Sequence, residues 1–352
     1  MLTVGIFGPP DDREVQALSS RIVNRGGAVR NIDLSRFPQD MTIEIRPDAV
    51  LVDHRSVFEL DAAFLRKRGV TVPHYIDYEK KCTVESPQEW QELYPDYCVY
   101  LENEVRVQSI RNTVIELTGQ SCRLVNSAAA NDLHRKKTGL LWHLRKSGLP
   151  VPDFVCGTDR AFLQMVNAGW EQAGRGTVIK PLAGIYKTLA LDDTAAAHHP
   201  WDKRPAFYQH YIRGETIRCY VLDGRVMAAA IIVHGNTVDS SMSQTGIEVI
   251  MLPAEAERIA VHTAHVLGID FCGLDLMRNE AGSYFLIDCN FSPMFVNFSL
   301  ASCIDIPALL ADFLLAAAAQ KKKQSLKTLS LLQEAKSLLA GDPDIRKKLL
   351  GK

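Results

Sequence analysis

The segment FCGLDLMRNEAGSYFLIDCN, residues 271–290, decides the fold, because it has the pattern of two antiparallel strands joined by a tight turn. With Ala281 and Gly282 at the tip of the turn, Asp275 lies opposite Asp288. Asn290 lies two residues beyond Asp288 and shares its face, as strand alternation requires. The segment therefore predicts a β-hairpin with two carboxylates and one amide on one face.

Two facing carboxylates repel each other by about 3 kcal/mol, at a separation of about 5 Å and an effective dielectric of about 20. Either one acid stays protonated or a cation binds. An oxygen-only set of two carboxylates and an amide suits Mg²⁺, with room for phosphate oxygens. In the alternative, both aspartates point to solvent. In both cases the buried face of the hairpin consists of Leu274, Leu276, Ile287 and Cys289.

Two cationic residues, Lys180 and Arg218, lie in other segments that have the pattern of a strand. Lys180 ends the apolar run TVIK directly before Pro181, where its ammonium needs an anionic partner unless the strand end lies at the surface. Arg218 lies upstream of the turn signal Asp223-Gly224, and alternation places it with Tyr220 on a polar face. An arginine in mid-strand can hold a phosphate in a fork geometry, or form an ordinary surface ion pair.

Composition excludes several classes of protein. The 352 residues exceed what one hydrophobic core usually holds, so two or three domains are expected. With 40 basic and 41 acidic residues, the chain has no excess positive charge that would attract nucleic acid or an anionic membrane. The N-terminus has the pattern of a first strand rather than a signal peptide, and the eight cysteines include no C-x-x-C pair. We therefore expect a cytoplasmic protein with reduced thiols and without nucleic-acid or membrane partners.

The first hundred residues have the pattern of a small α/β unit. A strand at TVGIFG precedes a helical pattern over 15–23, and a second strand pattern lies at 48–54. The glycines of the first turn have the wrong spacing for a dinucleotide site. Residues 74–106 are polar, aromatic and irregular, which fits either a connector or an embellishment facing a partner.

Along the chain, a basic helix ending in GLPVPDF is followed by a strand that ends at Lys180-Pro181. The segment FYQHYIRGETIRCYV comes next, and GLDLM and FLIDCNFSP follow it. This order resembles the ATP-grasp fold, and most closely the RimK-like carboxylate–amine ligases, over roughly residues 120–315. The resemblance implies an α/β plus α+β architecture, in which nucleotide lies between two subdomains. The expected domains are 1–105 (N-terminal α/β), 106–205 and 206–316 (the two ATP-grasp subdomains, the second with the metal site), and 317–352 (a helical tail).

The resemblance also implies roles for individual residues. Lys180 and Arg218 match catalytic groups that contact the phosphates and the transferred phosphoryl group. Lys137, with Lys136 as the competitor, matches a further nucleotide-binding lysine. The segment whose main chain binds adenine corresponds to Gln209, His210, Tyr211 and Ile212, followed by Glu215 or Thr216 at the ribose. The implied metal ligands are Asp275, Asp288 and Asn290.

This sequence departs from the family pattern mainly on the substrate side. The loop after Lys180 has only Gly184 where the family lid is glycine-rich, and Lys187 could supply a charge there. The strand AAAIIVHG lacks a family arginine, and SPMFVNF replaces a glycine-rich ending near the acceptor site.

The resemblance implies an ATP- and Mg²⁺-dependent ligase, with Mn²⁺ as the alternative metal. A small-molecule or peptide carboxylate becomes an acylphosphate, and an amine acceptor then displaces phosphate to give an amide and ADP. The alternatives are a small-molecule kinase and a non-catalytic nucleotide-binding or scaffold protein. The sequence is also compatible with a homo-oligomer.

Overall fold

A computed structural model of the chain describes residues 1–69, 87–134, 136–180, 182, 188–191, 205–234 and 244–341. The chain divides into two compact units, one formed by residues 1–124 together with 308–352 and the other by residues 125–307. The domain boundaries expected at residues 105 and 316 fall inside two helices, α2 (Pro87–Ser121) and α9 (Ile306–Gly341), and remain predictions.

The first unit contains a four-stranded sheet in the order β2-β1-β6-β7. Its strands are β1 (Thr3–Phe7), β2 (Ala28–Ile32), β6 (Ala62–Leu65) and β7 (Arg123–Val125). β1 pairs in parallel with both β2 and β6. The helix α1 (Arg13–Val23) follows β1 and begins at Asp12, whose carboxylate accepts hydrogen bonds from the backbone N–H groups of Glu14 and Val15. The predicted α/β start of the chain is therefore confirmed.

The strand predicted at residues 48–54 is confirmed, but β2, which precedes it, was not predicted from the sequence. Residues 48–54 contribute β4 (Val50–Val52) to a separate antiparallel sheet, with β3 (Ile43–Ile45) and β5 (Arg55–Ser56) as its neighbours. The strand beside β1 is β2, which includes Arg30. A hydropathy pattern does not reveal this strand, because Arg30 is polar. Its guanidinium is nevertheless buried, because it donates hydrogen bonds to three backbone carbonyls between residues 52 and 56. Short 3-10 helices follow β2 and β5, at Leu34–Arg36 and Val57–Glu59.

The polar and aromatic stretch at 74–106, predicted to be irregular, is helical from residue 87 onward. α2 starts at Pro87, a residue that favours the first position of a helix because it has no N–H to leave unpaired. Residues 70–86 lie outside the described part of the chain.

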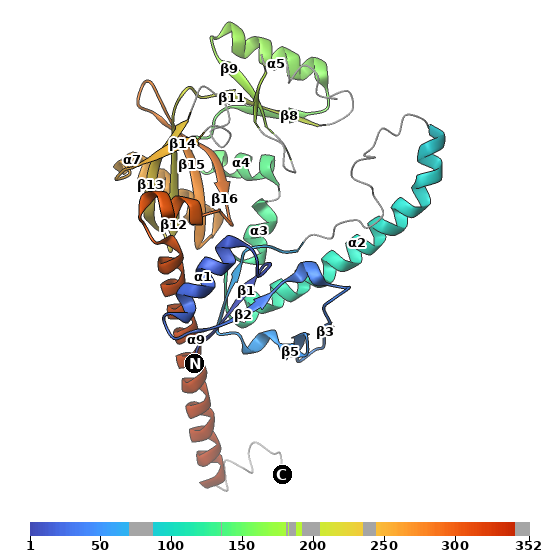
Figure 1. Cartoon of the computed structure of the whole chain (residues 1–352), viewed down its shortest axis with the longest axis vertical. Helices are drawn as coiled ribbons and strands as arrows, with labels where there is room; N and C mark the ends of the chain where they lie inside the picture. The colour runs from blue at the N-terminus through green and yellow to red at the C-terminus, as the bar shows by residue number, and fades with distance from the viewer. Residues whose placement is uncertain are drawn as a thin grey trace. The chain divides into compact units, whose positions relative to one another are not determined.

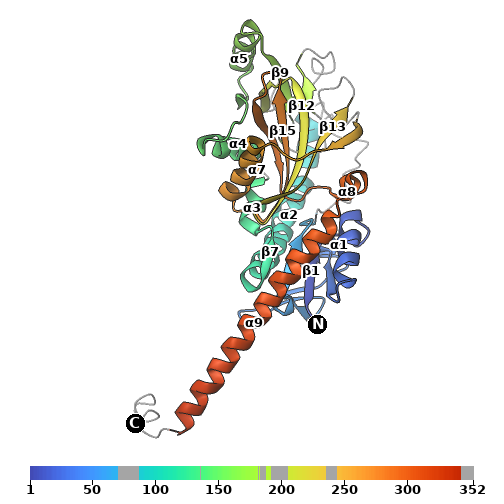
Figure 2. The same ribbon diagram turned by 90° about the vertical axis from the view of Figure 1, so that its left-hand side faces the viewer.

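The helix α9 completes the first unit (Figure 2). Leu310, Leu314 and Ala318 on this helix are fully buried. Further along, the Lys321 ammonium donates to the backbone carbonyls of two residues in and after the 3-10 helix at residues 57–59, at 3.1 and 2.6 Å. Residues 317–341 of the predicted helical tail therefore continue a helix whose first half belongs to the core of this unit, and residues 342–352 lie outside the described part of the chain.

No helix in the described part of the chain is by itself long and apolar enough to cross a membrane. The short helix α8 (Val296–Ser302) and residues 306–331 of α9 satisfy that test of length and composition only together, across a bend of 119°.

The second unit contains two antiparallel sheets (Figure 1). The smaller sheet has the order β10-β9-β11-β8, with β8 (Phe154–Gly157), β9 (Gly176–Lys180), β10 (Leu189–Ala190) and β11 (Ala206–Tyr211). The larger has the order β14-β13-β12-β15-β16, with β12 (Gly214–Leu222), β13 (Arg225–His234), β14 (Gln244–Val249), β15 (Phe271–Asn279) and β16 (Tyr284–Asn290). The helices are α3 (Ala128–His134), α4 (Lys137–Lys146), α5 (Arg160–Gln172), α7 (Ala254–Leu267) and α8.

Strand alternation gives the larger sheet one apolar and one polar face. Ile217, Cys219 and Val221 on β12 belong to the main core, together with apolar residues of α4 and α7. Arg218 and Tyr220 therefore lie on the opposite face, as the sequence predicted. The candidate site is built on this second face.

Candidate functional site

The hairpin of β15 and β16 places Asp275 opposite Asp288, as predicted. The loop, however, has three residues, 280–282, rather than the two or four of a symmetric loop about Ala281 and Gly282, because the N–H of Asn279 bonds to the carbonyl of Ser283. A β-bulge after Asp275 then shifts the register by one residue and restores the expected pairing.

The bulge also changes which residue faces the core. Leu276 pairs with Leu286, so Ile287 is the extra residue of the bulge and Leu286 is the buried one. The predicted buried face was therefore wrong at Ile287. The carbonyl of Ile287 accepts a hydrogen bond from the Lys180 ammonium at 3.1 Å. Lys180 lies at the end of β9 and is only 6% exposed, so the smaller sheet presents this cation to the hairpin.

Three residues form a row across β12, β15 and β16: Arg218, Asp275 and Asp288. The Arg218 guanidinium binds both oxygens of Asp275, with a distance of 2.9 Å from Nη2 to Oδ2. This fork raises the pKa of Arg218, although burial opposes the shift. The arginine predicted to meet a phosphoryl group is thus paired with a predicted metal ligand.

The second carboxylate of the row, that of Asp288, faces lysines. Lys137 Nζ lies 3.5 Å from Asp288 Oδ2, whereas Lys136 is exposed and precedes α4. Burial alone would raise the pKa of Asp288, but the charges of Lys137, Lys180 and His134 outweigh it and lower the pKa.

The repulsion between Asp275 and Asp288 therefore has an explanation that the sequence did not supply. Arg218 neutralises one carboxylate and Lys137 the other, so a bound cation is not needed to hold the two together. The prediction of a metal site then depends on the chemistry of the donors, and not on the repulsion between them.

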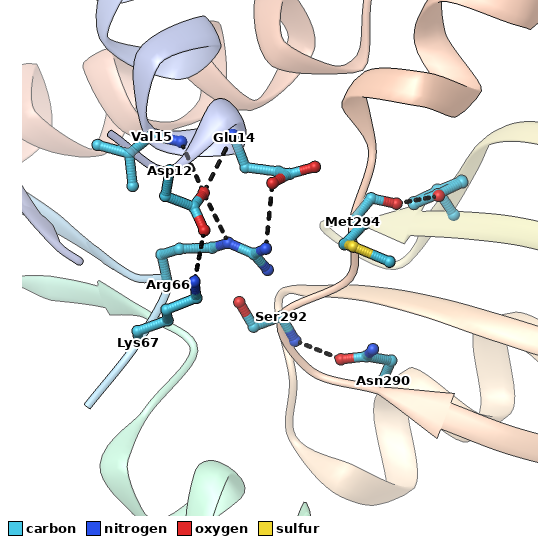
Figure 3. A network of polar contacts seen from close by, with 9 residues as sticks. Asp12, Glu14, Val15, Arg66, Lys67, Asn290, Ser292 and Met294 are labelled. Atoms are coloured by element: carbon cyan, nitrogen blue, oxygen red, sulfur yellow. Dashed lines mark hydrogen bonds and ion pairs between the residues drawn. The ribbon is translucent and has the colours of Figure 1, made fainter. Parts of the chain in front are cut away.

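A second row on the same face contains Tyr220, Gly273 and Asn290. Asn290 is exposed, and its side-chain oxygen accepts a hydrogen bond from the backbone N–H of Ser292 at 3.0 Å (Figure 3). A side chain on Gly273 would place its Cβ only 2.8 Å from Cβ of Pro293. Glycine at this position thus lets the Ser292–Met294 turn lie on the sheet beside Asn290.

The donor set fits a hard divalent cation. The side chain of Asp288 is 41% exposed and Asn290 is also accessible, so both can offer oxygen atoms to a ligand. Within the described ranges no three His, Cys, Asp or Glu side chains cluster as a ready-made metal centre. Two carboxylates and one amide leave coordination positions for phosphate oxygens, which is the arrangement that Mg²⁺ uses with nucleotides. The residues present therefore fit Mg²⁺.

The segment predicted to bind adenine ends β11. Gln209 is 1% exposed, and its side-chain Nε2 has no hydrogen-bond partner among the described residues. The backbone N–H of His210 is already bonded to the carbonyl of Asp153 at 2.8 Å, and burial lowers the pKa of the His210 imidazole. The main-chain contacts predicted for adenine are therefore not available from the N–H of His210. Tyr211 pairs with Gly176 of β9, and the buried Ile212 follows directly.

The two residues predicted to bind the ribose, Glu215 and Thr216, lie on opposite faces of β12. Glu215 forms an ion pair with Arg278, its neighbour across the sheet. Thr216 is the residue that shares the face of Arg218, because side chains alternate along the strand. The predicted lid, with Gly184 and Lys187, lies outside the described residues.

Sequence reasoning missed Asn126, a fully buried residue just after β7. Its amide nitrogen donates to the carbonyls of Phe271 and Phe291 at 2.6 and 2.7 Å. Its oxygen accepts from the N–H groups of Asp270 and Phe271 at 2.9 and 3.0 Å. Asn126 thus ties the start of β15 to the end of β16, the two strands that carry Asp275, Asp288 and Asn290. A single asparagine outside any motif gives no signal of such a role.

The first unit contains a polar network of its own, in which Asp12 and Glu14 bind Arg66 at 3.1 Å each (Figure 3). Asp12 also pairs with Lys67 at 2.8 Å. Burial would raise the pKa of Asp12, but hydrogen bonds from Lys67 and Arg66 lower it to about 2. These pairs join the start of α1 to the end of β6.

The larger antiparallel sheet carries the row of Arg218, Asp275 and Asp288, and the smaller antiparallel sheet presents Lys180 to it. The two sheets form an ATP-grasp fold, as expected. The ATP-grasp ligase PsnB, in a structure with a minimal precursor, Mg and ADP, superposes with a TM-score of 0.71. The match covers 90% of this chain and 98% of PsnB at 24% sequence identity. Residues 181–314 match the model of the RimK-like ATP-grasp domain.

Two curated relatives have similar sequences. Beta-citrylglutamate synthase B of Danio rerio is 26% identical over 260 residues, which is 70% of this chain and 64% of that protein. N-acetylaspartylglutamate synthase A of Mus musculus is 27% identical over 235 residues, which is 62% of this chain and 61% of that protein. The match thus spans less than two thirds of the length of either relative.

Proposed function

We propose that the protein is an ATP-dependent carboxylate–amine ligase, which forms an amide or peptide bond through an acylphosphate and releases ADP and phosphate. The row of Arg218, Asp275 and Asp288, with Lys137 and Lys180 beside it, is the single observation that carries the proposal. These three cations and two carboxylates leave one excess positive charge, which suits a polyphosphate. The occurrence of this row in a RimK-like ATP-grasp domain supports a ligase over a kinase or a scaffold.

In the proposed reaction the protein orients charges and supplies no nucleophile of its own. A substrate carboxylate attacks the γ-phosphoryl group, ADP leaves, and an amine then displaces phosphate from the acylphosphate. Lys137, Lys180 and Arg218 would stabilise the negative charge that spreads over the phosphoryl oxygens during transfer. When bound, Mg²⁺ would be held by Asp275, Asp288 and Asn290 and would neutralise phosphate charge.

The substrate class is proposed from the relatives. Both curated names contain glutamate, which makes glutamate the first amine to test. A structure of PsnB with its precursor peptide PsnA2 and AMPPNP makes a peptide the second candidate. We propose that the reaction takes place in the cytoplasm, where ATP and Mg²⁺ are available.

The test is release of ADP from ATP and Mg²⁺ across a panel of carboxylates and amines that includes glutamate and peptides. A ligase releases ADP only when both a carboxylate and an amine are present, whereas a kinase requires only a hydroxyl acceptor. Binding of nucleotide without release for any pair would favour a scaffold and would overturn the proposal.

The variant Asp288→Asn tests the metal site independently of the substrate. It should abolish the gain in nucleotide affinity that Mg²⁺ provides in calorimetry, because the amide carries no charge for the cation. Asp159→Asn is the matched control, because Asp159 caps α5 and is not part of the predicted site. If the nucleotide affinity depended equally on Mg²⁺ in the wild type and in Asp288→Asn, Asp288 would not be a metal ligand.

A further inference from the structure

Tyr220 is a buried residue of the site face to which none of the predicted roles applies. It lies two positions after Arg218 on β12 and is 1% exposed. Its hydroxyl donates to the backbone carbonyl of Met294 at 2.6 Å. Tyr220 shares the face of Arg218 on β12 and helps to raise the pKa of that arginine. As an oxygen acceptor, its hydroxyl can bond to the guanidinium while donating to Met294.

The ring of Tyr220 is fixed by its neighbours. Its centroid lies 4.8 Å from that of Phe298 on α8 and 6.4 Å from that of Phe271 on β15. Directly across the sheet, Gly273 leaves room for Pro293. The hydroxyl therefore has little freedom to move away from Met294.

Tyr220 thus links two parts of the candidate site. One is the Ser292–Met294 turn, which immediately follows the predicted ligand Asn290 and also bonds to it through Ser292. The other is Arg218, whose second partner is Asp275. An oxygen of Asp275 that binds a metal ion cannot also keep its full bond to the guanidinium. Tyr220 is then the partner that Arg218 retains.

We propose that Tyr220 is a positioning residue that holds Arg218 toward the terminal phosphate of a bound nucleotide and fixes the Ser292–Met294 turn beside it. The inference rests on the proposed function for the placement of the nucleotide. It goes beyond that function in assigning the orientation of Arg218 to a residue outside the predicted site.

The variant Tyr220→Phe removes only the hydroxyl and keeps the packed ring. Because a hydrogen bond to a charged group is lost, affinity for the β,γ-imido analogue of ATP should fall about tenfold. Affinity for ADP, which lacks the terminal phosphate, should change by less than about twofold, since Arg218 is the group displaced. Both affinities are measured by calorimetry with Mg²⁺, and thermal unfolding reports whether the variant is folded.

Tyr284→Phe is the matched control, because Tyr284 pairs with another arginine, Arg278, near the loop end of the same hairpin and raises the pKa of that arginine. It should leave the preference for the triphosphate unchanged. In an Arg218→Ala background, Tyr220→Phe should have no further effect on that preference, because the positioned group is gone. An equal loss for both nucleotides, no loss, or full additivity with Arg218→Ala would overturn the assignment.

The binding readout also separates this inference from the proposed function. A wild-type protein that releases no ADP with any carboxylate and amine contradicts the ligase, while the nucleotide preference of Tyr220→Phe still decides the role of Tyr220.

Discussion

Replacement of Asn126 should destabilise the second unit far more than its size suggests. Asn126→Ala removes four hydrogen bonds, of 2.6 to 3.0 Å, at a position with no exposed surface. At about 1 kcal/mol for each bond, the free energy of unfolding should fall by about 4 kcal/mol. The loss is large because two carbonyls and two N–H groups lose the hydrogen bonds that Asn126 makes to them.

The assay is urea-induced unfolding followed by circular dichroism. Asn126→Asp is a second variant of nearly equal volume, which keeps an acceptor for the two N–H groups but turns an oxygen toward two carbonyls. It should lose stability as well, which separates hydrogen bonding from the loss of volume. Asn167→Ala, which removes a surface bond to Glu171 at 2.8 Å, is the control and should change stability by less than about 0.5 kcal/mol. A loss below about 1 kcal/mol for Asn126→Ala would refute the reasoning.

Two further predictions concern Asp12 and Gly273. The pKa of Asp12 is lowered from 3.8 to about 2 by Lys67 and Arg66 against the effect of burial, so its stabilisation is present above pH 4 and lost as the pH falls toward 2. Acid should lower the free energy of unfolding by about 2 kcal/mol less in Asp12→Asn than in the wild type, as measured by urea unfolding. An unchanged pH dependence would contradict this. Gly273→Ala should cost about 1–3 kcal/mol by overpacking against Pro293 and should weaken Mg²⁺-dependent nucleotide binding in calorimetry. Unchanged binding would show that the turn tolerates the methyl group.

Local patterns predicted the hairpin well. The alternation around Asp275 and Asp288 and the turn between them are properties of one continuous segment, and the pairing follows from geometry. The same pairing results in a different way, because the three-residue loop shifts the register by one residue and the bulge shifts it back. A bulge changes no residue type, so the sequence could not indicate that Ile287 leaves the core and offers its carbonyl to Lys180.

Contacts between distant residues could not be predicted in this way. Arg218 and Asp275 are 57 residues apart, and Asn126 and Phe271 are 145 apart. Each partner looks unremarkable within its own segment, and only the order of the strands brings the pair together. Buried polar residues were missed for a related reason, because a hydropathy pattern treats Arg30 as a surface residue although backbone carbonyls satisfy it.

The return of α9 to the first unit has a consequence for biosynthesis. A ribosome delivers β1, α1 and β2 early, but Leu310 and Leu314 complete their core only after the entire intervening ATP-grasp segment has been made. Until then the surface around Gly27, which Leu315 covers in the finished protein, stays open to solvent. The fold of β1, α1 and β2 is therefore completed only after α9 has been translated, and nascent chains should depend on chaperones during that interval.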